Sequence, residues 1–191
     1  MKIKFIVNIK KYYNKKKKKT KDGKLGRSIL YKGENYTINN VKHEKDVISI
    51  RIDEKNKIFK IFLPSQMQKE EEDYWIQKTI RKLFKDNTEA IIAKKLPYLS
   101  NVTKIKYKSV KIRDAKTRYG SCATKTKDLH FSSRLVMLPE YAIDAVIVHE
   151  LCHIVHPNHS KQFYDLVKKY IPNYEEIDKY LKKEAGKEID F

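Results

Sequence analysis

The chain has 191 residues, enough for one domain with a substantial core, and its 40% hydrophobic content excludes a wholly disordered protein. Its five glycines and five prolines exclude collagen-like and proline-rich classes, and no apolar run approaches the roughly 18 residues of a membrane span. Two cysteines, Cys122 and Cys152, are too few for a disulfide-stapled secreted scaffold, so we expect a cytoplasmic protein with free thiols.

The net charge of +19 is concentrated near the N-terminus, where residues 10–27 include five consecutive lysines. Such a block repels itself and buries nothing, so we expect residues 1–27 to form a mobile basic arm and residues 28–191 to form the folded domain. The arm could bind nucleic acid or another polyanion. The alternative is a lysine-rich surface without a partner, since specific phosphate contacts favour arginine.

The first part of the predicted domain has the period of β-strands. Residues 29–38 hold two short apolar runs on either side of a turn that contains Gly33. Residues 46–64 are typical of a β-hairpin, because apolar and polar residues alternate around a polar turn. Residues 1–9 alternate in a similar way, although the pattern does not indicate whether they pair. We therefore expect an N-terminal antiparallel sheet.

The apolar spacing then changes from two to about 3.6, which predicts a helix over residues 70–96. Its first turns are acidic, as the helix dipole favours, and Pro97 is expected to end it. Further strands are expected within residues 102–114 and 117–138.

Pro139 is a suitable start for a helix that continues to His156, where Pro157 and Asn158 interrupt it. Two more helices are expected, one from Ser160 and one over residues 173–183. The predicted strands thus lie mainly in the first part of the chain, and the last part is predicted to be helical.

Residues 149–153 read H-E-L-C-H within this predicted helix. Positions i and i+4 are about 40° apart around a helix, so His149 and His153 point to one side. Two neutral imidazoles suit Zn²⁺. Glu150 lies about 100° away, close enough to reach a water at the metal without being a ligand. The motif therefore predicts a zinc site with Glu150 as general base.

Two histidines compete to be the third ligand. His156 lies on nearly the same face but about 10 Å along the axis from His149. His159 follows the Pro157 turn and has the offset of the third ligand in the metzincin pattern, so we favour His159. The alternative is a buried helix with surface histidines and no metal, but the strongly apolar residues 145–148 argue against it. We expect Cys122 and Cys152 to be packed, and His43 and His130 to be ordinary strand or surface histidines.

Residues 146–174 resemble the YgjP-like metallopeptidase family, whose members are relatives of the SprT-type zincins. The matching positions after the helix are Asn158, His159, Ser160, Phe163, Pro172 and Tyr174. A second family block, R-W-G-S-C, is present as residues 118–122, and residues 110–114 and 131–135 match the family's upstream strand and L-N-x-R-L segment. The resemblance covers about residues 28–185.

The resemblance implies a zincin-like α+β fold, with zinc held by His149, His153 and His159 and with Glu150 as base. The sequence departs from the family pattern at Tyr119, which replaces tryptophan, and at Ser132, which replaces asparagine. The lysine-rich arm is not part of the pattern.

The R-Y-G-S-C block has two interpretations. If this turn lies near the zinc, Arg118 orients an anionic group or a polarised carbonyl, and Arg118 and Tyr119 become candidates for substrate binding. Alternatively, Gly120 only permits a tight turn and Arg118 is a structural ion-pair partner.

These features predict a zinc-dependent metallohydrolase that acts as a peptidase on peptides or proteins. One alternative is a zinc-dependent hydrolase of nucleotide phosphoanhydrides, although the sequence has no phosphate-binding loop. The other is a nucleic-acid-associated zincin module that the basic arm tethers.

Overall fold

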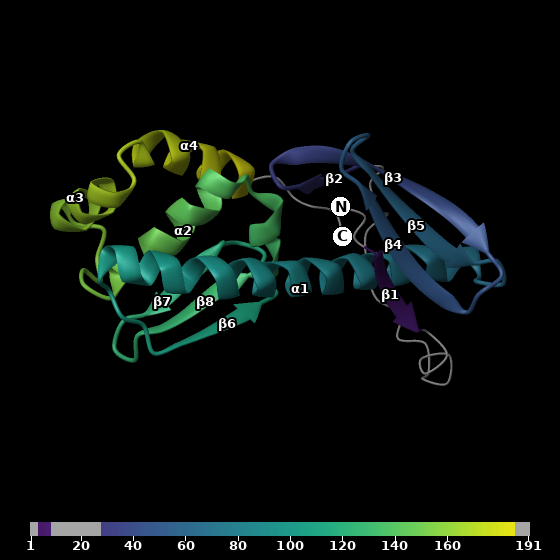
Figure 1. Cartoon of the computed structure of the whole chain (residues 1–191), viewed down its shortest axis with the longest axis horizontal. Helices are drawn as coiled ribbons and strands as arrows, with labels where there is room; N and C mark the ends of the chain where they lie inside the picture. Colours follow the sequence, from purple (N-terminus) through teal and green to yellow (C-terminus); the bar gives the residue numbers. More distant parts are fainter. Residues whose placement is uncertain (1–3, 9–27, 186–191) are drawn as a thin grey trace. The chain divides into compact units, whose positions relative to one another are not determined.

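The computed structural model describes residues 4–8 and 28–185, and these residues form an α+β fold, as predicted. The chain divides between Leu83 and Phe84 into two compact units. A mixed sheet belongs to the first unit, and a smaller sheet with several helices belongs to the second (Figure 1). No helix in the described part of the chain is long and apolar enough to cross a membrane.

The strands of the first unit are β1 (Lys4–Asn8), β2 (Ser28–Tyr31), β3 (Glu34–His43), β4 (Val47–Asp53) and β5 (Ile58–Pro64). Their order is β1-β4-β5-β3-β2, and all neighbours are antiparallel except β3 and β5. The prediction of an antiparallel sheet is therefore wrong for this pair. The chain reverses after β3 and again after β4, so β3 and β5 point the same way. They pair because β4 occupies the other edge of β5.

Both predicted turns of this sheet are confirmed. Lys32 and Gly33 join β2 to β3 with φ angles of 53° and 82°, which suit a two-residue hairpin turn. β4 and β5 form the predicted hairpin, with Ile50 opposite Ile61. β1 pairs with β4, whereas residues 9–27, which hold most of the predicted basic arm, lie outside the described residues.

Helix α1 (Lys69–Thr103) begins where the acidic run predicted it but continues through Pro97. The prediction that Pro97 ends the helix is therefore wrong. The proline ring removes one backbone hydrogen bond, which costs about 3 kcal/mol in a helix interior. Leu96 and Leu99, on either side of it, are buried in the core of the second unit. Each such side chain contributes roughly 1.5–3 kcal/mol on burial, so packing outweighs the lost bond.

The second unit has a three-stranded sheet and a helical C-terminal part. Its elements are β6 (Ser109–Arg113), β7 (Gly120–Ala123), β8 (Asp128–Ser132), a 3-10 helix η1 (Ser133–Met137), α2 (Glu140–His153), α3 (Lys161–Tyr170) and α4 (Tyr174–Ala185). The sheet order is β6-β8-β7, so β7 is an edge strand, antiparallel to β8. Ser160 caps α3 by accepting a hydrogen bond from the backbone N–H of Phe163.

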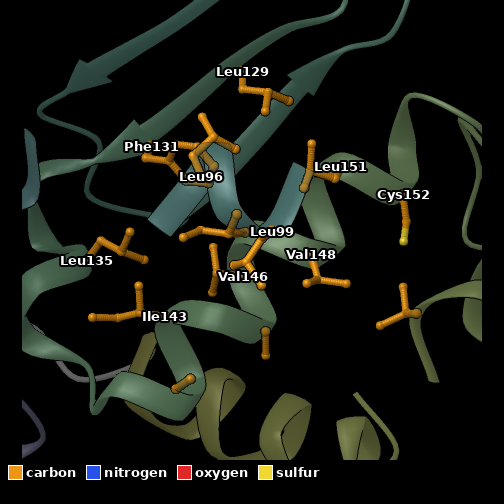
Figure 2. Close-up of a cluster of buried hydrophobic side chains, with 14 of the residues drawn as sticks. Leu96, Leu99, Leu129, Phe131, Leu135, Ile143, Val146, Val148, Leu151 and Cys152 are labelled. Atoms are coloured by element: carbon orange, nitrogen blue, oxygen red, sulfur yellow. The ribbon is translucent and has the colours of Figure 1, made fainter. Parts of the chain in front are cut away.

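Helix α2 is embedded in the core of this unit. Figure 2 shows Val146, Val148 and Leu151 of α2 in one apolar cluster with Leu99 of α1 and Phe131 of β8. Nine of the fourteen residues of α2 are buried. A helix with most of its residues packed in the core has little freedom to shift. It is therefore a rigid support for the side chains at its C-terminal end.

Candidate metal centre

Three histidine rings converge at the end of α2. His149 and His153 project from its last turns, and His159 approaches from the segment between α2 and α3. Nε2 of His149 lies 3.0 Å from Nε2 of His153 and 3.2 Å from Nε2 of His159. The structure thus brings together the three histidines that the spacing predicted, and the chain turns back after α2 ends at His153, three residues earlier than expected.

The spacing of these nitrogens fits the tetrahedral coordination of a cation. Zinc–nitrogen bonds of 2.0–2.1 Å at the tetrahedral angle place ligand nitrogens about 3.3 Å apart. The two separations between these nitrogens, 3.0 Å and 3.2 Å, are within a few tenths of an ångström of that value. A hydrogen bond joins only two of these nitrogens, through one hydrogen atom, whereas a cation can bind all three. A shared cation therefore explains the convergence of three rings better than hydrogen bonding does.

The orientation of His153 is fixed by the backbone. Its Nδ1 donates to the carbonyl oxygen of His156 at 3.3 Å, because a carbonyl can only accept. The neutral ring then has its free lone pair on Nε2, the atom that faces the other two histidines. His156, the rival candidate in the sequence, is not in the cluster and supports it through this carbonyl.

His149 is oriented by a residue that the sequence did not single out as functional. The hydroxyl of Tyr174, the first residue of α4, lies 2.6 Å from Nδ1 of His149. The two rings are stacked with centroids 5.9 Å apart. Tyr174 matches the family pattern, but nothing in its local sequence indicates this long-range contact.

Phe163 forms an aromatic floor beneath the histidines. Its ring centroid lies 4.5 Å from that of His153 and 4.9 Å from those of His149 and His159. The Phe163 side chain is fully buried. Its place in the first turn of α3, just after the Ser160 cap, is the one local signal that could have pointed to it.

Burial keeps the histidines in the form that binds metals. Desolvation, assisted by the nearby charges of His153 and His159, lowers the pKa of His149 to about 3. Burial also lowers the pKa of His153. Both rings are therefore neutral near pH 7, and a neutral imidazole is the ligand form.

Glu150 is buried beside this cluster, with 5% of its surface exposed. Desolvation raises the pKa of its carboxyl to about 8, and the positive charge of Arg118 opposes that rise. Within the described residues Oε2 of Glu150 has no hydrogen-bond partner. A buried carboxyl with a free oxygen is suited to take and return a proton.

The R-Y-G-S-C block does lie next to Glu150. Gly120, at the start of β7, is so close that a Cβ there would be 2.6 Å from Oε1 of Glu150. Arg118 is exposed, and its positive charge lowers the pKa of Glu150. Arg118 forms no ion pair with any residue in the described ranges. Tyr119 is half-buried against the core, and burial raises its pKa.

The remaining candidates lie outside the histidine cluster. Cys152 is fully buried and Cys122 half-buried, and both thiols are free. Burial raises the pKa of Cys122 to about 11 and that of Cys152 to about 12, so neither is a thiolate near pH 7. His43 binds the backbone oxygen of Val47, and His130 lies beside Arg113.

The chain is similar to known metallopeptidases. The solved structures of the metallopeptidase zymogens abylysin of Pyrococcus abyssi and jannalysin of Methanocaldococcus jannaschii are each 22% identical to it, with TM-scores of 0.43 and 0.44. The matches cover 48% and 49% of this chain, and 93% and 95% of the abylysin and jannalysin chains, respectively. No curated protein matches significantly. The family described as YgjP-like, metallopeptidase domain, matches residues 2–184, and the chain therefore belongs to the YgjP-like metallopeptidase family.

Proposed function

We propose that the protein is a zinc-dependent metallopeptidase with a zincin-like fold, in which His149, His153 and His159 hold the zinc and Glu150 is the general base. The observation that carries this proposal is the convergence of three Nε2 atoms at the spacing of a tetrahedral zinc site. Three protein ligands leave a fourth position open, as in catalytic rather than structural zinc sites. When bound, zinc would supply a Lewis acid that polarises a peptide carbonyl and acidifies a water molecule.

Glu150 performs the proton transfers in this proposal. Its carboxylate takes the proton of the attacking water and passes it to the nitrogen of the leaving amine. Burial supports this role because it raises the pKa of Glu150 to about 8, which brings the acid and base forms into balance near neutral pH. With a cation held by the histidines, the carboxylate form of Glu150 would be favoured, and this is the form that acts as a base.

Arg118 and Tyr119 are proposed to contact the substrate. Arg118 is exposed and near enough to Glu150 to affect its pKa, so its guanidinium can bind a carbonyl or carboxylate of a peptide at the reaction site. The family description names a peptidase and neither a nucleotide nor a nucleic acid. Peptides and proteins are therefore favoured as substrates over nucleotides, and they are favoured over nucleic acid as partners.

The test compares the wild-type protein with Glu150→Gln and His153→Ala. We expect about one zinc per chain in the wild type and in Glu150→Gln, and much less in His153→Ala, by elemental mass spectrometry. We expect hydrolysis of casein-derived peptides only by the wild type. Hydrolysis by Glu150→Gln at the wild-type rate, or a wild type that binds no zinc when it is offered, would overturn the proposal. Hydrolysis of nucleoside triphosphates in place of peptides would favour the phosphoanhydride alternative.

A further inference from the structure

His149 and His153, the two half-buried histidines of the cluster, are held in different ways. Nδ1 of His153 bonds to a backbone carbonyl three residues further along the chain. Nδ1 of His149 bonds instead to the hydroxyl of Tyr174, a side chain 25 residues away on α4. The orientation of His149 therefore depends on how a separate helix is docked.

The chemistry of the His149 ring makes this contact important. A neutral imidazole that offers Nε2 to a cation must keep its proton on Nδ1, and that buried N–H then needs an acceptor. The Tyr174 oxygen, 2.6 Å away, is the acceptor that the structure provides. Tyr174 is only 3% exposed, so water does not replace it easily.

We propose that Tyr174 is a positioning residue of the metal centre, whose hydroxyl fixes the tautomer and orientation of His149 and thereby couples metal binding to the docking of α4. The inference rests on the proposed function, because it assumes that His149 is a ligand. Coupling of this kind is reciprocal: if the docked helix strengthens metal binding, bound metal stabilises the docked helix to the same extent.

The first experiment measures the zinc affinity of the full-length protein and of Tyr174→Phe, by competition with a chromophoric chelator. The variant keeps the buried ring and loses only the hydroxyl. We expect zinc to bind about 10–100-fold more weakly, the usual effect of removing the hydrogen-bond partner of a ligand histidine. The absorption spectrum of the Co²⁺-loaded protein should also change, because the geometry of one ligand is relaxed.

Tyr164→Phe is the matched control. The Tyr164 ring lies 6.0 Å from that of His159 and 6.4 Å from that of Tyr174. Its hydroxyl makes no hydrogen bond to the three histidines among the residues that the structure describes. We expect this variant to bind zinc like the wild type. Equal zinc affinity in Tyr174→Phe and the wild type would overturn the proposal, even if the variant unfolds more easily.

A second measurement needs no variant. We expect zinc to slow amide hydrogen exchange in α4 of the wild-type protein, and we expect this protection to be reduced in Tyr174→Phe. Exchange in α4 that is insensitive to zinc would overturn the coupling. If the wild type binds zinc tightly and only the Tyr174 effects are missing, the proposed function stands and the positioning role fails. A wild type that does not bind zinc would overturn both.

Discussion

Gly120 and Glu150 lie in such close contact that a single methyl group would not fit between them. A Cβ at position 120 would come within 2.6 Å of Oε1 and 2.7 Å of Cγ of Glu150. Glu150 is buried on a helix that is itself embedded in the core, so a displacement of the carboxyl disturbs the packing around it. The backbone of the edge strand β7 therefore packs directly against the side chain of Glu150, the proposed general base.

We expect Gly120→Ala to displace Glu150 and to destabilise the protein by about 1–3 kcal/mol, the range for overpacked cores. Peptide hydrolysis should fall strongly while zinc content stays near one per chain, because the clash is with Glu150 and not with the histidines. Denaturant unfolding and elemental analysis check the two parts. Ser121→Ala is the control, since alternate residues of a strand point to opposite faces. Wild-type activity in Gly120→Ala would contradict the described packing.

The metal-free protein should have a distinctive dependence of stability on pH. Burial raises the pKa of Glu150 from 4.5 to about 8, so the folded state holds a proton that the unfolded state releases, and stability falls as pH rises toward 8. Burial lowers the pKa of His149 from 6.5 to about 3, so stability falls as pH drops below 6.5. Between pH 4.5 and 6.5 the two effects offset each other.

We therefore expect chelator-treated protein to lose up to about 1.4 kcal/mol per pH unit between pH 6.5 and 8 through Glu150. Thermal unfolding across this range measures the effect. Glu150→Gln has no carboxyl to titrate and should be flat there. An equal slope in both proteins would show that Glu150 is not the group responsible.

Phe163→Leu tests the aromatic floor beneath the histidines. The smaller side chain leaves part of the space under three rings unfilled, so we expect zinc to bind on the order of tenfold more weakly. The loss of folding stability should be smaller than the roughly 3–5 kcal/mol of a phenylalanine-to-alanine change. Val167→Ala, one turn further along α3 and also fully buried, should reduce stability without weakening zinc binding. Equal zinc affinities in both variants would contradict a specific role of Phe163.

Pro97→Ala should stabilise the protein. Pro97 lies inside α1 at an exposed position, where alanine restores a backbone hydrogen bond and removes a steric clash. Alanine also gives the unfolded chain more freedom, which offsets up to about 1 kcal/mol of that gain. We expect a net increase of about 1–2 kcal/mol in the free energy of unfolding, measured by chemical denaturation. A decrease would mean that the proline ring itself packs favourably.

The sequence predicts the site better than the fold around it. The positions of His149 and His153 follow from helical spacing, and that of His159 from the turn at Pro157, so local geometry was enough to bring all three together. Pro97 was misinterpreted because tertiary packing of its neighbours, which a local pattern does not contain, keeps the helix intact. The parallel pairing of β3 with β5 was missed for the same reason, since strand order is a long-range property.

The supporting residues of the site were the hardest to predict. Tyr174 and Phe163 match the family pattern, but their local sequence does not indicate that the fold places them against the histidines. The hydrogen bond that joins Tyr174 to His149 spans 25 residues and depends on the path of two intervening segments. No periodicity encodes it.

The closeness of the three histidines in the chain also bears on folding. Only ten positions separate His149 from His159, so a cation held by them cross-links a short loop. Closing a short loop removes little entropy from the denatured ensemble, and a flexible chain with these three side chains can chelate the cation as well. We therefore expect the folded architecture to persist without its metal, in contrast to small zinc-organised domains that unfold when the metal is removed.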